Sequence, residues 1–169
     1  MSLGPESLLA EPVVALELDL RWVQPEEVRT VQDTKFVSIT KEGPLHGLAL
    51  WFDATFCPLV YDEEEGTAIQ REVLGTGPRD PATHWKQTVL LLLGQGVDTL
   101  EKDEVVGWRL GLEQAEDNPR QYRLSLEVLD PEQEEHPVPC DCGVAKCALF
   151  KAVLEKEERE LEQLEEMVA

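Results

Sequence analysis

"VVGWRLGLEQAEDNPRQYRLSLEVL" occupies residues 105–129 and contains two runs with the two-residue period of a half-buried strand. The first run places four large apolar side chains on one face, namely Val106, Trp108, Leu110 and Leu112. The opposite face carries Gly107 and Gly111, which indicate strong bending or a close neighbour on that side. The second run alternates in the same way, and "EDNPR" between the two is typical of a hairpin loop. We therefore predict an antiparallel hairpin here.

Four further segments have the composition of strands: "VALELDL" (14–20), "TKFVSIT" (34–40), "GLALWFDATF" (47–56) and "KQTVLLLL" (86–93). Turn signals rich in glycine and proline separate the segments. A βαβ arrangement would need amphipathic helices between the strands, and none is visible before residue 140. The pattern predicts a mainly β fold, an antiparallel β-barrel-like domain followed by a C-terminal α-helix.

Composition divides the chain into four expected parts. These are a flexible N-terminus (1–10), the barrel domain (11–130), a linker containing proline, acidic residues and cysteine (131–147), and the helix (148–169). The helix has a narrow apolar seam, too short to predict a coiled coil, made by Leu154, Leu161, Leu164 and Val168. Such a helix fits packing on the barrel, self-association or binding of a partner, or a fraying end.

Charge and cysteine usage narrow the classes of partner. The 169 residues include 35 acidic and 15 basic side chains, a formal net charge of -20, which disfavours nucleic acid and membrane surfaces and favours Arg- or Lys-rich partners. The sequence has neither an apolar run of membrane-spanning length nor the features of a signal peptide. Four cysteines form no secreted framework, so we expect an intracellular protein, cytoplasmic and/or nuclear.

Several motifs resemble chemical sites, but in each case the residues favour a purely structural role. The turns Gly75-Thr76-Gly77 and Gly94-Gln95-Gly96 do not complete a phosphate-binding loop, and no helix follows either. Cys57, at a strand end, is typical of a small buried residue. Four side chains could ligate zinc, His136, Cys140, Cys142 and Cys147, but their spacing lacks paired CxxC knuckles. We therefore expect a linker with a helix start and no metal site, although metal binding by the three thiols, adventitious or genuine, stays open.

The triplet Thr83-His84-Trp85 lies between a proline-rich turn and an apolar run. Periodicity alone favours packing, in which the indole buries area and the imidazole bonds a nearby carbonyl or carboxylate. The alternative is that the pair caps a pocket, because an indole face attracts a cation and an imidazole can hold a carboxylate in place. The residues themselves leave both interpretations open.

Three motifs appear in an order that resembles a known family: "HGLALWFDATF" (46–56), "LGTGP" (74–78) and "PATHWKQTVLLL" (81–92). Together they are similar to the C-terminal, substrate-side β-barrel of the protein arginine N-methyltransferases. The resemblance runs from about Glu17 to Val128. Gly75 stands where the family usually has Ser, and the segment after Asp130 has no recognised counterpart.

The resemblance implies a division of labour between two domains. The family's S-adenosylmethionine-binding domain, with its glycine-rich loop and paired glutamates, has no match in this sequence. The chain alone is therefore expected to hold no cofactor and to be inactive, with S-adenosylmethionine bound by the full-length enzyme. The triplet would form the substrate-binding loop, in which His84 supports catalysis by bonding an acidic residue of the other domain and Trp85 shapes the channel for the substrate arginine.

The resemblance also implies the partners. These are Arg-rich protein substrates and the methyltransferase domain, with self-association through the C-terminal helix as a further expectation. The alternative function is a non-catalytic binding or scaffolding module that retains only the barrel.

Overall fold

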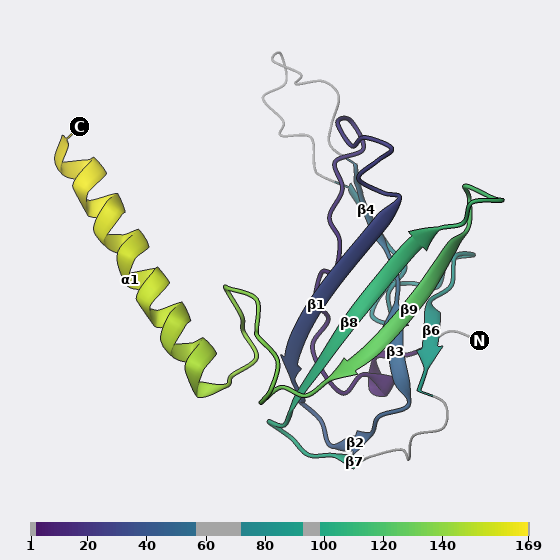
Figure 1. The fold of residues 1–169 in the computed structure, drawn as a ribbon, viewed down its shortest axis with the longest axis horizontal. Helices are drawn as coiled ribbons and strands as arrows, with labels where there is room; N and C mark the ends of the chain where they lie inside the picture. The colour runs from purple at the N-terminus through teal and green to yellow at the C-terminus, as the bar shows by residue number, and fades with distance from the viewer. Residues whose placement is uncertain (1–2, 57–71, 93–98, 169) are drawn as a thin grey trace. The chain divides into compact units, whose positions relative to one another are not determined.

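The computed structural model describes residues 3–56, 72–92 and 99–168, and the statements below concern those ranges. They form antiparallel strands followed by one C-terminal helix (Figure 1), which confirms the predicted fold class. The chain divides into two compact units. One combines Met1–Leu8 with Pro44–Asp98, and the other combines Leu9–Gly43 with Thr99–Ala169.

The second unit is built on a three-stranded antiparallel sheet of order β1-β8-β9 (Figure 1). Its strands are β1 (Thr30–Ser38), β8 (Val105–Gln114) and β9 (Tyr122–Leu129). Strands β8 and β9 form the predicted hairpin, in which Gln114 pairs with Tyr122. The loop between them is closed by a hydrogen bond from the backbone N–H of Ala115 to the carbonyl of Gln121, 2.9 Å long. The prediction drawn from "EDNPR" is therefore confirmed.

The two faces of this sheet carry different side chains. Leu110, from the predicted apolar face of β8, is 2 % exposed and is the most deeply buried leucine of the core. On the opposite face, Gly107 is paired with Phe36 on one neighbouring strand and with Leu129 on the other. The side chains of Phe36 and Leu129 therefore lie on the same face, on either side of the glycine. A Cβ on Gly107 would lie 2.4 Å from Cε1 of Phe36. The close neighbour predicted beside the glycines is present.

The first unit contains two antiparallel pairs. Strand β3 (Gly47–Leu50) pairs with β6 (Thr88–Leu91), and β4 (Asp53–Phe56) pairs with β5 (Glu72–Gly75). The single strand predicted over 47–56 is thus split at residues 51–52. Splitting lets the first half join β6 while the second half joins β5.

The strand predicted over 14–20 is not formed. The backbone there makes no ladder, and the alternating Leu16, Leu18 and Leu20 are 42 %, 39 % and 83 % exposed. A two-residue period shows which side chains share a face, but a strand also needs a neighbouring backbone for its hydrogen bonds. Among the described residues the strands form separate short sheets, and no closed barrel is present.

The remaining elements are short, apart from the helix. Strands β2 (Gly43–Pro44) and β7 (Thr99–Leu100) have two residues each, and a 3-10 helix, Pro5–Ser7, lies in the N-terminus that was predicted to be flexible. Helix α1 (Ala145–Val168) begins three residues before the predicted start. No helix in the described ranges is both long and apolar enough to cross a membrane.

The fit of Phe36 over Gly107 generates a test of the sheet. We expect Gly107→Ala to lower the free energy of unfolding by about 1–3 kcal/mol, because the new methyl group overlaps the Phe36 ring and the Cβ of Leu129. Gly111→Ala is the matched control, since its Cβ would meet only the hydroxyl of exposed Ser125, which can rotate away. Urea denaturation measures both, and equal losses for the two variants would contradict the packing argument.

Candidate functional site

The triplet Thr83-His84-Trp85 lies in a loop, residues 76–87, that connects β5 to β6 within the first unit. The two ends of this loop are joined directly. The side-chain amide of Gln87 donates a hydrogen bond to the carbonyl of Thr76, with a length of 2.8 Å. The other end of the same amide accepts a 3.2 Å bond from the backbone N–H of Leu3. Gln87 therefore closes the base of the loop.

Thr76 anchors this base to the turn between β3 and β4. It is the buried polar side chain of the described core, 3 % exposed. Its hydroxyl donates a 2.7 Å bond to the carbonyl of Phe52 and accepts a 3.2 Å bond from the N–H of the same residue. The backbone N–H of Thr76 also reaches the Phe52 carbonyl, at 3.2 Å. Both polar groups of Phe52 are satisfied by one threonine.

Asp80 folds back over the glycine turn. Its carboxylate accepts a 3.0 Å bond from the N–H of Gly77, and its own N–H donates to the Gly77 carbonyl. A Cβ on Gly75 would overlap the Asp80 carboxyl group, and one on Gly77 would lie 2.6 Å from Nε1 of Trp51. The absence of side chains at these two glycines leaves room for the carboxylate of Asp80. This arrangement agrees with the structural interpretation of the turn, because a bound phosphate would face that carboxylate.

The three predicted residues lie together at the exposed part of the loop. The hydroxyl of Thr83 donates a 3.0 Å bond to the carbonyl of Trp85, which tightens the backbone around His84. The imidazole and indole rings lie 3.8 Å apart between centroids, tilted by 36°. Phe52 meets the indole edge-on, at 5.8 Å. Trp85 remains 44 % exposed, and His84 is exposed as well.

This geometry places two exposed rings on a held support. The exposed indole can contact a cation, and the imidazole can exchange a hydrogen bond with a carboxylate. Sequence reasoning missed the residues that hold the pair, namely Thr76, Gln87, Asp80 and Phe52. Only the short "LGTGP" motif pointed to this base, and it gave no indication of the contact with Phe52.

A second group of side chains comes together in the other unit. His136, Cys140, Cys142 and Cys147, which the sequence offered as candidate ligands, have their donor atoms within 4.8 Å of one another. Burial raises the pKa of the Cys140 thiol to about 12 and raises the pKa of Cys147 above its usual value. Buried thiols of this kind are poor nucleophiles. Cys57 and the turn Gly94-Gln95-Gly96 lie outside the described residues.

Comparisons with known proteins agree with the motif-based resemblance. Residues 1–129 match the family described as the arginine methyltransferase oligomerization subdomain. Protein arginine N-methyltransferase 2 of Mus musculus is 42% identical over 90 residues, which cover 53% of this chain and 19% of the relative. Protein arginine N-methyltransferase 6 of Xenopus laevis is 36% identical over 124 residues, covering 73% of this chain and 33% of the relative. The matched part of the chain thus spans only a minor fraction of these relatives.

A solved structure shares the fold. The crystal structure of PRMT6 superposes with a TM-score of 0.55 at 24% sequence identity, over 75% of this chain and 39% of that one. A structure of PRMT6-SAH matches with the same values. Residues 130–169, which contain the cysteine group and α1, lie beyond the part that matches the family.

The buried threonine generates a prediction for the loop base. Thr76→Val keeps the shape of the side chain but removes its hydroxyl, leaving the N–H of Phe52 without its hydrogen-bond acceptor. We expect a loss of about 1–2 kcal/mol in the free energy of unfolding. Thr88→Val, at an exposed position of β6, is the control and should change stability by less than about 0.5 kcal/mol. Urea melts that shift equally for the two variants would show that the buried hydroxyl does not secure the loop.

Proposed function

Because this chain belongs to the protein arginine methyltransferase family, we propose that it forms the substrate-side part of an enzyme that transfers methyl groups to arginine side chains. In this proposal the loop containing Thr83, His84 and Trp85 faces the domain that binds the methyl donor. The observation that carries it is the exposed pair of His84 and Trp85, whose ring centroids lie 3.8 Å apart on a loop whose base is closed.

Exposure of this pair favours recognition over core packing. A tryptophan that serves the core leaves little of its surface to solvent, whereas Trp85 leaves 44 % exposed. The supports beneath it, Thr76 and Gln87, make the hydrogen bonds that hold the loop, so the exposed parts of the two rings are available to a partner. Holding a recognition group in its bound orientation reduces the entropy lost on binding.

Each ring suits a different task in arginine methylation. The imidazole of His84 bonds an acidic side chain of the methyl-donor domain and thereby fixes the two domains in register. The indole of Trp85 forms one wall of the channel along which the guanidinium group enters, because a delocalised cation stacks well on an aromatic face. Thr83 maintains the backbone of the triplet through its bond to the Trp85 carbonyl.

The chemical step itself depends on groups outside this chain. S-adenosylmethionine supplies the methyl group in the full-length enzyme, and the acidic side chains that orient the guanidinium belong to the donor-binding domain. This chain contributes binding and positioning. Positioning matters because a misplacement of about 1 Å between reacting atoms can cost a hundredfold in rate.

The charge of the chain supports a basic protein substrate. A formal net charge of -20 creates a long-range attraction for segments rich in arginine and raises their rate of encounter. Such steering weakens as salt is added, since ions screen charges separated by more than about 8 Å at physiological ionic strength.

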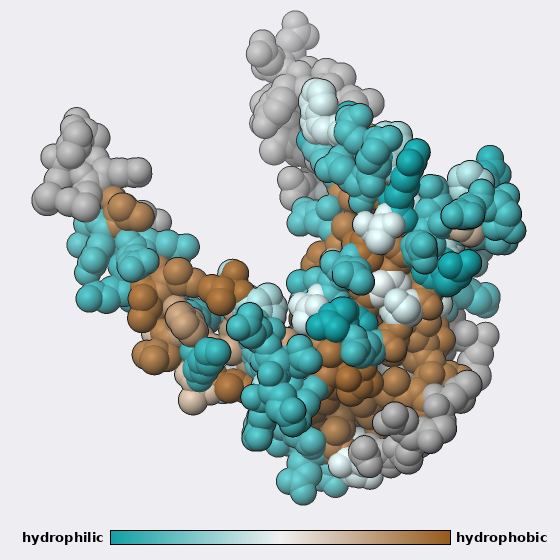
Figure 2. All heavy atoms as spheres, viewed as in Figure 1, coloured by the Kyte–Doolittle hydropathy of each residue, from teal (hydrophilic) through white to brown (hydrophobic). Residues whose placement is uncertain are grey.

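We also propose that this part of the molecule self-associates, as the name of the family's oligomerization subdomain suggests. Helix α1 offers one surface for this, because several of its apolar side chains are exposed (Figure 2): Leu149, Phe150, Val153 and Leu161. The sheet-bearing residues that match the family offer another. Association through α1 and association through the matched residues can be distinguished, because different substitutions should abolish each.

The role of the loop can be tested in a full-length enzyme. We expect His84→Ala and Trp85→Ala each to lower kcat/KM for an arginine-rich peptide by at least about tenfold, because each removes a positioning contact worth about 1.4 kcal/mol or more. Both variants should stay folded at the assay temperature, because His84 is exposed and Trp85 is 44 % exposed, so neither truncation opens a closed cavity in the core. Lys86→Ala, at the exposed neighbouring position, is the control and should keep its activity. Full activity of Trp85→Ala would refute the proposed role of the loop, whereas a full-length parent that does not methylate the peptide would favour a binding module without catalysis.

A further prediction separates the two routes to self-association. The double substitution Leu149→Ser with Val153→Ser removes two exposed apolar side chains one helical turn apart. If α1 mediates association, sedimentation equilibrium should show a dissociation constant raised by at least about tenfold, equivalent to about 1.4 kcal/mol. Glu157→Ser, also exposed on α1, should leave it unchanged. An unaltered constant in the double variant would exclude the helix and assign association to the matched residues.

A further inference from the structure

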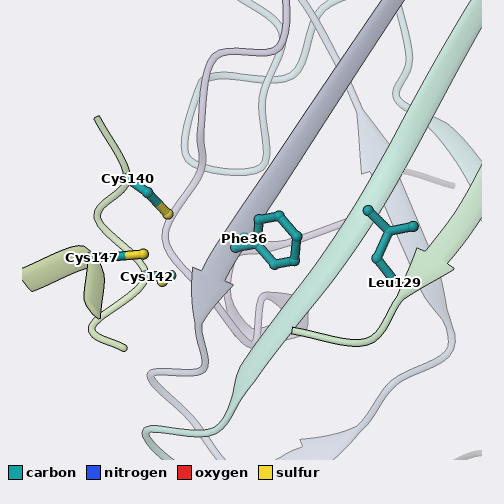
Figure 3. Packing of buried hydrophobic residues seen from close by; sticks show 5 residues of the cluster. All are labelled: Phe36, Leu129, Cys140, Cys142 and Cys147. Carbon is teal, nitrogen blue, oxygen red and sulfur yellow. The ribbon is translucent and has the colours of Figure 1, made fainter. Parts of the chain in front are cut away.

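Four side chains that can ligate a metal converge in the segment after β9 and the first turn of α1. Cys140 and Cys142 come from the loop that follows His136, and Cys147 comes from the first turn of α1 (Figure 3). The three sulfur atoms lie 3.7, 3.3 and 3.2 Å from Nδ1 of His136, in the order Cys140, Cys142, Cys147. All three cysteines are buried, Cys142 completely.

These distances match the edges of a zinc-centred tetrahedron. A zinc ion lies about 2.3 Å from a thiolate sulfur and about 2.0–2.1 Å from an imidazole nitrogen, so a tetrahedral site separates sulfur from nitrogen by about 3.6 Å. The observed separations of 3.2–3.7 Å bracket that value. The complete set of donor atoms lies within 4.8 Å, and the widest pairs need only close toward the sulfur–sulfur edge of about 3.8 Å that a tetrahedral zinc site has.

The histidine is oriented as a ligand. Its Nε2 lies 2.9 Å from the carbonyl oxygen of Pro131. A carbonyl can only accept a hydrogen bond, so Nε2 carries the proton and, in the neutral ring, Nδ1 presents its lone pair to the sulfurs. Metal-bound histidines typically use their second nitrogen in this way, which fixes both the tautomer and the ring orientation. The ring also stacks on Phe36, with centroids 3.7 Å apart and planes within 9°.

Hydrogen bonding among the four groups holds the arrangement only weakly. Nδ1 has one lone pair and can accept one S–H, or, if protonated, can donate one bond to one sulfur. Either case leaves the other two thiols to hydrogen-bond only to neighbouring cysteine sulfurs, which are weak acceptors. A cation at the centre satisfies all four donors at once.

The spacing of the four residues lacks paired CxxC motifs, and a reversal of the backbone brings them together instead. The chain changes direction at Gly143, between Cys142 and the helix. Its φ of +81° is a backbone conformation that residues other than glycine rarely adopt. The helix then begins at Ala145, and its first turn presents Cys147 to the other ligands. The carbonyl of Cys142 also accepts a hydrogen bond from the Ser38 hydroxyl of β1. Two contacts, from Phe36 and Ser38, thus connect this segment to the sheet.

We propose that His136, Cys140, Cys142 and Cys147 bind one zinc ion in a closed, structural site. Three soft thiolates and an imidazole form a donor set that zinc favours and that magnesium and calcium do not. Since protein atoms fill all four positions, the ion has no open position for a substrate. The site fastens the start of α1 to strand β1, and the segment predicted as a linker becomes a folded element.

The metal content of the purified full-length chain tests the proposal. After growth with zinc and removal of loosely bound metal by gel filtration, elemental analysis should find about one zinc per chain. Cys142→Ser should reduce this to less than about a fifth of the wild-type value, because a hydroxyl is a poor zinc ligand. Cys57→Ser is the matched control, a cysteine outside the four-residue group, and should retain the full content.

A second measurement separates a ligand role from a role in folding. His136→Cys replaces nitrogen by another soft donor and should keep about one metal per chain, whereas His136→Ala should lose it. Refolding of the wild type with Co²⁺ should give the intense visible bands of a tetrahedral thiolate complex, and His136→Cys should shift those bands. Retention with a shifted spectrum identifies position 136 as a ligand.

Three results would overturn the proposal. The first is a wild-type chain that holds less than about a tenth of an equivalent of zinc. The second is an equal zinc content in wild type and Cys142→Ser, which would mean an adventitious ion only. The third is a mass lower by two hydrogens, which would reveal a disulfide between two of the cysteines.

Discussion

The ring of Phe36 is the contact on which most of the second unit depends. It occupies the space left by Gly107 on the neighbouring strand, lies beside Leu129, and stacks on His136. A sheet side chain thereby connects the β1-β8-β9 ladder to the segment that precedes the helix (Figure 3). Because interiors are close-packed, a change at any of these four positions moves the others.

The candidate loop in the first unit follows a different principle. Its base is secured by polar contacts from Thr76 and Gln87, while its tip presents His84 and Trp85 to solvent. A buried, satisfied hydrogen-bond network is costly to disturb, so it holds the backbone in place without using the rings at the tip. The loop therefore combines a fixed base with two rings that remain largely exposed at its tip.

Sequence patterns predicted the elements whose information is local. The hairpin of β8 and β9 was predicted because alternation and a short turn suffice to specify it. The alternating leucines of 14–20 gave the same signal and failed, since a strand also needs a partner, which the pattern does not reveal. The triplet Thr83-His84-Trp85 was identified through a family resemblance, but its support by Thr76 required the three-dimensional contact with Phe52. The convergence of Cys147 on His136 could not be predicted from spacing, because it depends on the reversal at Gly143 and on where the helix begins.

The sheet order also sets the order of assembly. Strands β8 and β9 are joined by a short loop, so their pairing closes quickly, but β1 pairs with β8 across the whole of residues 39–104. At about 5–20 residues per second, β1 leaves the ribosome several seconds before its partner exists. During that interval its backbone donors and acceptors are open to other strands, including those of neighbouring nascent chains. The time available for the intervening unit to fold is thus also the time during which β1 must be kept from pairing wrongly.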